Sequence, residues 1–560
     1  MTGDDFHDRW AVGLTVACLR IVVLVSTLAL GAPSQAQSPP STQASDPRAM
    51  GWMQGFPPPA DKTIRFTDPD YFSFPKLRWT VCHFRELMPT AGVDRGPGAA
   101  SALPQAPEPG IDALRFTPLG GQASMSWGEA FDANHTDGLL VLHHGRVVYE
   151  RYAGCLGPHT LHGAMSLTKS ITGLLGEVLV AEGALDENAR VGTLIPQLQD
   201  SAFGDASVRQ VLDMTTALQF SEDYADPNAE VWQHAQAGST LPPPAGYTGP
   251  RSYYESLQQI RKSGEHGQVF GYKTPNADAL GWLLARTTGK PLNELLAERI
   301  WRRIGAEREA FYTVDAIGTP FAGGGFNVTL RDLARLGQLI LQQGEWQGVQ
   351  LLPSAAIERI QRGGERAPFA RAGYAQLPGW SYRAMWWHSG DAHGAFSARG
   401  VHGQTLWIDP VADVVIARLA SHPVAANAAN DPTSLPAWRA VTKHLMAQDQ
   451  TPLLGGQWVI EDVAGAGVID RTRAFLRFLA DGRLVGHATC NGLRGHHTSG
   501  ARGRLRLRLT GITRKRCAPA LMHQEERLLA LLPRVTRYRI DDSGALWLYT
   551  AAGKTLTARR

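Results

Sequence analysis

Long apolar runs are almost absent from this sequence of 560 residues, and after residue 32 none is long enough to cross a bilayer. The 59 glycines and 35 prolines follow no fixed period. Charged residues make up only 19% of the chain, against 43% hydrophobic residues. These features exclude a polytopic membrane protein, a collagen-like or other fibrous chain and a chain that is mainly disordered. A globular protein remains.

Cysteine is scarce, with five residues in the chain. Cys18 lies before the apolar run near the N-terminus, which leaves four cysteines that could form three alternative pairings. We favour Cys490–Cys517, because both lie in one late domain, and the alternative is four buried free thiols. None of the cysteines has the Cys-x-x-Cys or Cys/His spacing of a metal site, so we expect no metal. We also expect no other cofactor.

The first 36 residues are typical of a secretory signal peptide. Ile21 to Ala32 is an apolar run of 12 residues, too short to span a bilayer comfortably, and Ser34-Gln35-Ala36 offers a small–x–small cleavage site. An uncleaved membrane anchor is the alternative, because the apolar stretch extends loosely back to Ala11. We therefore expect the protein in the bacterial cell envelope, either periplasmic or secreted.

Composition and periodicity divide the rest of the chain into four parts. Residues 37–110 are rich in Pro and Gly and predict a linker and an extended N-terminal arm. Residues 111–446 mix strand and helix patterns, residues 447–455 form a linker, and residues 456–560 are mostly short strands and turns.

The strand patterns predict an α/β (α+β) fold. A hairpin at Gly138 to Tyr152 and strands at Gln404–Ile408 and Val414–Leu419 would form an antiparallel sheet, flanked by helices and interrupted by an inserted helical region. Within the arm, Arg78 to Phe84 has the alternation of a strand. The last part predicts a separate, small β-rich domain.

Charge is distributed unevenly between these parts. Residues 451–560 hold 17 Arg and 2 Lys against 8 acidic residues, which gives this part a net charge of +11. Since the whole chain has a net charge of +4, the net charge of residues 1–450 is −7. In Arg502 to Arg508, arginine alternates with Leu and Gly, which predicts a strand with one charged face. That face is either simply solvated or meets an anionic surface of the envelope. The small total charge gives no reason to expect a nucleic-acid partner.

One Ser-x-x-Lys motif is placed where it could catalyse a reaction. Ser166 opens a strongly periodic helix, and Lys169 lies three residues later on the same helical face, so a neutral Lys169 could take the proton of the serine. The chain holds a second such motif, Ser73 to Lys76, but Pro75 interrupts it in a turn-rich segment. The Gly-x-Ser-x-Gly elbow and the His-Glu-x-x-His metal helix are missing.

From about residue 50 to 445, the sequence resembles the penicillin-recognising serine hydrolases: class C β-lactamases, D-alanyl-D-alanine peptidases and related esterases. Within this family, the sequence resembles the subgroup of 6-aminohexanoate-dimer hydrolases, which act on nylon oligomers and short esters. The matching segments, besides Ser166 to Lys169, are Met53 to Pro59, Asp223 to Pro227, Phe270 to Asn276 with Leu280-Gly281, Gly323 to Phe326, Asp332 to Arg335, and Gly400 to Gln404 with Asp409-Pro410.

The resemblance implies a role for individual residues. Ser166 would be the nucleophile, Lys169 the base and Tyr272 a second proton relay. The backbone N–H groups of Ser166 and Val401 would form the oxyanion hole. The other expected substrate-binding residues are Tyr224, Asn276, Gly400 and His402.

Two departures from the family pattern argue against β-lactam chemistry. Thr274 stands where many relatives have Asn, and Ala398-Arg399-Gly400 replaces the Lys-Thr-Gly motif that holds a β-lactam carboxylate. We expect Arg399 to point to the other face of its strand. An amide or ester hydrolase acting on a small molecule is favoured over a β-lactamase or D-Ala-D-Ala carboxypeptidase.

Residues 451–560 resemble a META domain, a β-rich module known from heat-inducible lipoproteins of the bacterial outer membrane. Cys490-Asn491 followed by Gly495 is the most specific matching segment. A non-catalytic envelope binding protein, in which the META domain is the working part, is the alternative function. Nothing in the sequence indicates an oligomeric state.

Overall fold

The computed structural model describes residues 39–560, apart from residues 239, 451–452, 455, 470–471, 473, 480, 501–502 and 542. The expected signal peptide lies outside the described residues. Within them, no helix combines the length and the apolar character needed to cross a membrane.

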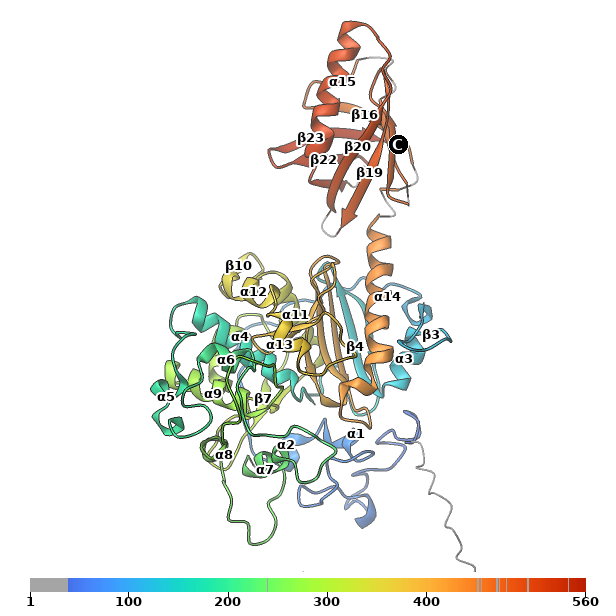
Figure 1. The fold of residues 1–560 in the computed structure, drawn as a ribbon. Coiled ribbons are helices and arrows are strands. Elements are labelled where there is room, and N and C mark those ends of the chain that lie inside the picture. The colour runs from blue at the N-terminus through green and yellow to red at the C-terminus, as the bar shows by residue number, and fades with distance from the viewer. Residues whose placement is uncertain are drawn as a thin grey trace, which may run out of the picture. The chain divides into compact units, whose positions relative to one another are not determined.

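A seven-stranded antiparallel sheet forms the centre of the larger domain, in the order β11-β12-β13-β14-β15-β4-β5 (Figure 1). The predicted hairpin is confirmed: its turn residues His144 and Gly145 have φ values of 52° and 71°, and two left-handed residues are what a tight hairpin turn requires. The strands are β4 (Thr136–His143), β5 (Arg146–Tyr152), β11 (Ser381–Arg383), β12 (Trp386–His388), β13 (Phe396–Gly400), β14 (Gln404–Asp409) and β15 (Val414–Ala420).

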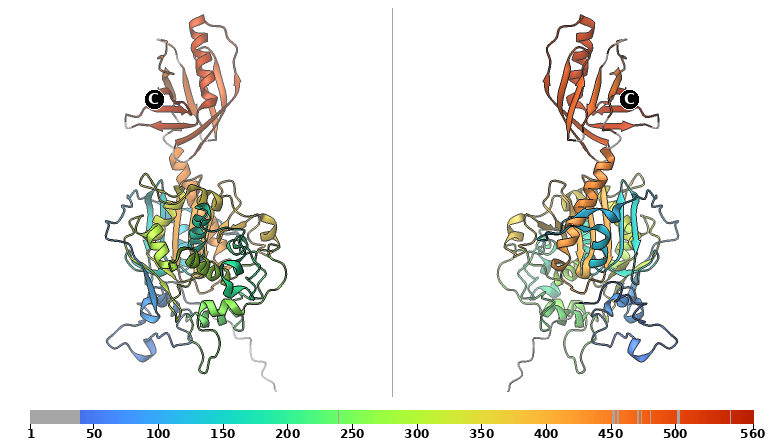
Figure 2. Two further views of the ribbon diagram at one scale, coloured as in Figure 1. Left: turned by 90° about the vertical axis from the view of Figure 1, so that its left-hand side faces the viewer. Right: turned by 90° about the vertical axis from the view of Figure 1, so that its right-hand side faces the viewer.

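Helices cover both faces of this sheet (Figures 1 and 2). On one face, α11 (Leu330–Leu341) packs so closely that a Cβ added at Gly337 would lie 2.5 Å from Val415. On the other face, the guanidinium of Arg418 lies 5.2 Å from the ring of Trp438 in α14 (Asp431–Gln450). Val415 and Arg418 are three positions apart on β15 and therefore point to opposite faces.

Helix α4 (Leu167–Ala181) carries the Ser-x-x-Lys motif and is buried over most of its length. The inserted helical region follows it in sequence and ends before the late strands. Its helices are α5 (Val191–Leu194), α6 (Val208–Leu212), α7 (Glu230–Ala237), α8 (Tyr253–Gln259), α9 (Pro275–Thr288) and α10 (Leu292–Leu296).

The N-terminal arm is built into the larger domain. It contributes β1 (Thr90–Val93) to a second sheet, in the order β1-β7-β8-β6, with β6 (His162–Gly163), β7 (Ala310–Thr313) and β8 (Phe326–Val328). A disulfide between Cys82 and Cys155 ties the arm to the segment after β5. This pairing was one of the open alternatives.

The strand expected at Arg78 to Phe84 is wrong, because α1 (Leu77–Thr80) and α2 (Phe84–Leu87) occupy this segment. The alternation of polar and apolar residues misled the prediction, since the polar Arg78 and Thr80 are buried as well. Arg78 is fully buried and pairs with Asp137 at 2.9 Å.

The C-terminal residues form a closed antiparallel barrel of eight strands with its own hydrophobic core. The expected disulfide Cys490–Cys517 is confirmed. The expectation of a small β-rich domain in this part of the chain is confirmed. The elements of this domain are β16 (Trp458–Val463), β17 (Phe475–Phe478), β18 (Arg483–His487), β19 (Gly492–Gly500), β20 (Arg504–Ile512), α15 (Pro519–Leu531), β21 (Arg537–Ile540), β22 (Leu546–Thr550) and β23 (Gly553–Arg559).

The boundary between the two parts differs slightly from the expectation. Helix α14 continues to Gln450, so residues 447–450 of the expected linker are helical. Neither Pro nor Gly occurs in this stretch to end the helix earlier.

Candidate active site

Ser166 and Lys169 lie together at the N-terminus of α4. Lys169 Nζ donates a hydrogen bond of 2.9 Å to Ser166 Oγ and a second of 2.6 Å to the carbonyl oxygen of Gly323. Their side chains are almost enclosed, since Ser166 is 8% and Lys169 1% exposed. Met165, just before the serine, has a left-handed φ of 50°, a strained conformation that is common at functional sites. The arrangement is that of a serine with an adjacent base.

Burial makes Lys169 a usable base. It lowers the pKa of Lys169 to about 8, although the nearby carboxylates of Glu222 and Asp278 act in the opposite direction. Burial disfavours the ammonium form, because the charge would be removed from water. A substantial fraction of Lys169 is therefore neutral at mildly alkaline pH, as a general base must be.

Tyr272 lies beside the lysine, with its ring centroid 5.1 Å from Lys169 Nζ. Burial raises the pKa of Tyr272 well above the usual value, while a hydrogen bond with Ser166 lowers it. Tyr272 thus remains a neutral phenol over the ordinary pH range. In that form it can donate a proton and receive one in return.

Gly400 lets strand β13 approach the nucleophile. A Cβ at this position would lie 3.0 Å from the backbone nitrogen of Ser166 and 2.6 Å from the carbonyl oxygen of Ala164. Val401, the next residue, lines the same cavity as Ser166. The two backbone N–H groups expected to form an oxyanion hole therefore come from segments that meet at the serine.

The cavity in front of Ser166 is predominantly apolar and includes about 820 Å³ of empty space, its open mouth counted. The arm supplies Tyr71, Phe72, Phe84 and Met88 to its wall, a role that the sequence analysis did not identify. The remaining lining residues are Met165, Lys169, Tyr224, Val231, Trp232, His234, Ala235, Thr240, Leu241, Thr274, Thr313, Phe321, Gly323, Gly324, Asn327 and Val401.

Tyr224 lines this cavity, as expected, and is held by a carboxylate that the sequence analysis overlooked. Its hydroxyl donates a hydrogen bond of 2.6 Å to Glu222. The same carboxylate accepts the backbone N–H of Thr274 at 2.9 Å and its hydroxyl. Glu222 thus connects the loop that carries Tyr224 to the segment that carries Tyr272.

A second buried pair stabilises the acceptor of Lys169. His234 Nε2 lies 2.8 Å from Asp278 Oδ2, and Asp278 Oδ1 accepts the backbone N–H of Gly323 at 3.2 Å. Gly323 in turn receives the hydrogen bond of Lys169. The glycine run at 323–325 was noted in the sequence only as part of the family resemblance.

Three of the four expected substrate-binding residues, Asn276, Gly400 and His402, are not among the residues that line the cavity. Asn276 is fully buried in α9, where its Oδ1 accepts a hydrogen bond from Thr216. A residue two positions beyond Thr274 on a helix points away from it, which explains the error. His402 is 7% exposed, its Nδ1 lies 2.7 Å from the carbonyl oxygen of His422, and its ring packs behind Phe72. Burial lowers the pKa of His402 to about 4.

Two other basic residues considered in the sequence interact with acidic side chains outside the cavity. Arg399 pairs with Asp431. Lys76 of the second Ser-x-x-Lys motif hydrogen-bonds Asp70 at 2.7 Å. No group of three or more His, Cys, Asp or Glu residues in the described part of the chain is arranged to hold a metal ion.

Comparison with known proteins agrees with this geometry. The profile of the Beta-lactamase family matches residues 129–436, more than half of the chain. The chain belongs to the beta-lactamase family. The profile of the META domain matches residues 451–560, so this family member carries a C-terminal META domain, which is the eight-stranded barrel.

Two relatives of this beta-lactamase family member bear names that indicate an activity. It is 35% identical over 352 residues to a 6-aminohexanoate-dimer hydrolase from Paenarthrobacter ureafaciens, covering 62% of this chain and 86% of the relative. It is also similar to the solved structure of a proposed 6-aminohexanoate-dimer hydrolase from Bacillus anthracis, with 32% identity and a TM-score of 0.63 over 68% of this chain and 97% of the other. The family resemblance found in the sequence is confirmed.

Proposed function

We propose that this protein is an exported serine hydrolase that cleaves ester or amide bonds through an acyl-enzyme on Ser166. The observation that carries the proposal is the 2.9 Å hydrogen bond from Lys169 to Ser166, at the wall of an apolar cavity. The two disulfides support export, because disulfides persist in oxidising compartments.

In the acylation step, neutral Lys169 takes the proton of Ser166, and the serine oxygen attacks the carbonyl carbon of the substrate. The negative charge that develops on the carbonyl oxygen is stabilised by the backbone N–H groups of Ser166 and Val401. Tyr272 donates its proton to the leaving alcohol or amine and is reprotonated from Lys169. The acyl group remains on Ser166 Oγ.

In the deacylation step, a water molecule replaces the leaving group. As the water attacks the ester carbonyl, Tyr272 takes a proton from it and passes its own phenolic proton to neutral Lys169. Lys169 then gives this proton to Ser166 Oγ as the acyl bond breaks, which restores neutral Lys169 and protonated Tyr272. The acid product then leaves. The steps require no metal ion or cofactor, because the protons move among Ser166, Lys169 and Tyr272.

The cavity favours an uncharged substrate. The aromatic and aliphatic side chains of the arm and of Phe321 form much of its wall, and none of its lining residues is acidic. The ends of a linear aminohexanoate dimer are an ammonium and a carboxylate at neutral pH, and the lining holds no carboxylate for the ammonium. We therefore propose that neutral esters with apolar acyl groups are better substrates than the aminohexanoate dimer, which the relatives' names suggest.

The experiment uses the full-length mature protein with an active-site serine label and a panel of p-nitrophenyl esters, a linear aminohexanoate amide and a β-lactam. We expect labelling at Ser166 and turnover of the esters, with both lost in Ser166→Ala. Ser73→Ala, in the second Ser-x-x-Lys motif, is the matched control and should keep full activity. Absence of both labelling and turnover would refute the enzyme and favour the binding-protein alternative.

A further inference from the structure

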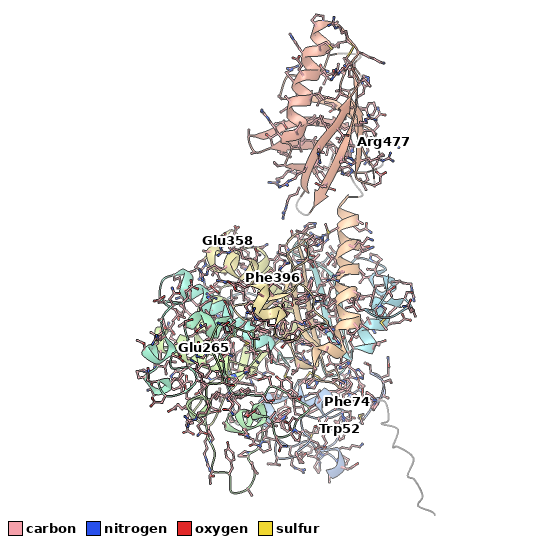
Figure 3. The ribbon with its side chains drawn as sticks, in the orientation of Figure 1. Trp52, Phe74, Glu265, Glu358, Phe396 and Arg477 are labelled. Carbon is pink, nitrogen blue, oxygen red and sulfur yellow. A yellow bond between two sulfur atoms is a disulfide. The ribbon has the colours of Figure 1, made fainter. Side chains whose placement is uncertain are left out.

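The outer surface of the META barrel carries a continuous basic face, formed by the exposed side chains of strands β17–β21. These five strands contain eight arginines, and neither aspartate nor glutamate occurs in them. All eight arginines are exposed. Arg477, labelled in Figure 3, lies on the outside of the barrel. The others are Arg483, Arg494, Arg504, Arg506, Arg508, Arg537 and Arg539.

Strand register brings these arginines side by side. Arg504 of β20 lies directly opposite Arg537 of β21, and Arg508 lies opposite His496 of β19, which in turn lies opposite Arg483 of β18. Like charges directly opposite one another destabilise a sheet. Along β20, Arg504, Arg506 and Arg508 alternate with inward-facing leucines, so their side chains leave the barrel about 7 Å apart.

Little acidic charge compensates this face within the barrel. Arg483 pairs with Asp481 at 2.6 Å, in the turn before β18. No ion pair to a carboxylate is found for the three arginines of β20 among the described residues. Guanidinium groups are well suited to bind phosphate and carboxylate oxygens in a bidentate manner. An unneutralised array of them is therefore a surface for a partner with many anionic groups.

The end of β20 adds an apolar element to this surface. Ile512 is 41% exposed, and the exposed residues Arg514, Lys515 and Arg516 follow it. This segment is fixed in place, because the backbone N–H of Lys515 donates to Asn491 at 2.6 Å and Cys517 is bonded to Cys490. Basic residues beside an exposed aliphatic side chain suit the interface of an anionic lipid layer, which offers both charge and apolar contact.

We propose that the basic face of the META barrel binds anionic lipid headgroups and so holds the enzyme at a membrane surface. Basic surfaces that bind single-stranded nucleic acid carry exposed aromatic side chains on which the bases stack. No Phe, Tyr or Trp side chain of strands β17–β21 is exposed. The binding is electrostatic and falls as salt concentration rises.

The test is sedimentation of the full-length protein with vesicles of 30 mol% phosphatidylglycerol in phosphatidylcholine, or of phosphatidylcholine alone, in 50 and 500 mM NaCl. We expect binding to the anionic vesicles only, and weaker binding in high salt. The variant Arg504→Gln/Arg506→Gln/Arg508→Gln should bind about 100-fold more weakly, because each basic residue near such a surface contributes roughly a factor of five.

A matched control removes three exposed arginines of the larger domain instead, Arg65→Gln/Arg261→Gln/Arg308→Gln. This variant should bind vesicles like the parent protein, and neither variant should have a thermal unfolding midpoint below that of the parent. Absence of binding to anionic vesicles, or an equal loss in both variants, would overturn the proposal. Tighter binding to duplex or single-stranded DNA than to the vesicles at the same salt would overturn it in favour of a nucleic-acid surface.

Discussion

Lys169 Nζ lies 2.9 Å from Ser166 Oγ, and no carboxylate forms an ion pair with this lysine among the described residues. Its second acceptor is a neutral carbonyl, that of Gly323. Most buried lysines are paired with an acid, because an unpaired ammonium is costly to bury. Burial of the unpaired lysine lowers the stability of the folded protein, and it also favours the neutral amine, which is the form that a base needs.

Lys169→Met tests this interpretation. We expect kcat/KM for a p-nitrophenyl ester to fall by about 10²–10⁴, the usual contribution of a general base. Methionine fills a similar volume and removes the buried amine, so the free energy of unfolding should change by less than about 2 kcal/mol. Steady-state kinetics and denaturant unfolding check the two statements. If Lys169→Met kept a tenth of the parent kcat/KM, Lys169 would not be the general base.

The pH dependence of the reaction follows from the same group. Burial lowers the pKa of Lys169 to about 8, and the base acts when it is neutral, so kcat/KM should rise with pH and reach half its plateau near pH 8. Tyr272, whose pKa burial raises, stays protonated throughout this window. A profile measured between pH 5.5 and 9.5 that is flat across pH 8 would contradict the assignment.

Glu222→Gln should move this profile in a defined direction. Glu222 raises the pKa of Lys169, so removal of its charge lowers that pKa, and the rising limb shifts to lower pH. The one carbonyl oxygen of glutamine can still accept the hydrogen bond from Tyr224, and the hydrogen bond from the backbone N–H of Thr274 is lost. Asp223→Asn, at the exposed neighbouring position, is the matched control and should leave the midpoint unchanged. A loss of activity without any shift would make the role of Glu222 purely structural.

The contact between Ser166 and Lys169, our proposed nucleophile and base, was predictable from the sequence because it is local. Three residues of one helix separate them, and helical geometry alone brings them together. Glu222, which holds Tyr224, and the aromatic residues of the arm that line the cavity belong to segments without periodicity that lie about 50 to 100 residues away from Ser166. Only the tertiary fold brings them to the serine, so sequence patterns could not reveal them.

The errors have an equally physical origin. Asn276 was placed in the cleft by its position in a motif, but the helix that begins at Pro275 turns it inward to Thr216. His402 follows Val401, yet its left-handed φ of 61° directs the chain so that its ring packs against Phe72. A family pattern specifies which residues lie in a segment, and the local backbone decides which of them face the substrate.

The disulfide Cys82–Cys155 should control both stability and substrate binding. It closes a loop of 73 residues and fixes the arm, which supplies Tyr71 and Phe72 to the cavity wall. Cys82→Ala/Cys155→Ala should lower the free energy of unfolding by about 2–4 kcal/mol and raise KM for esters with apolar acyl groups. Cys490→Ala/Cys517→Ala, in the barrel, is the control and should leave KM unchanged. If both double variants changed KM equally, the arm would have no specific role in substrate binding.

Gly400→Ala tests the proposed oxyanion hole and leaves Ser166, Lys169 and Tyr272, the groups proposed to transfer protons, in place. The new methyl group would lie 2.6 Å from the carbonyl oxygen of Ala164 and 3.0 Å from the backbone nitrogen of Ser166, so β13 or the start of α4 must shift. Loss of a well-placed oxyanion donor costs about 10²–10³ in kcat. Gly98→Ala, where a Cβ would meet nothing within 4 Å, is the control and should keep full activity.

The fall in activity of Gly400→Ala should appear in kcat, with little change in KM, because the oxyanion develops only in the transition state. A variant that raised KM alone would show that Gly400 makes room for the substrate and has no part in forming the hole.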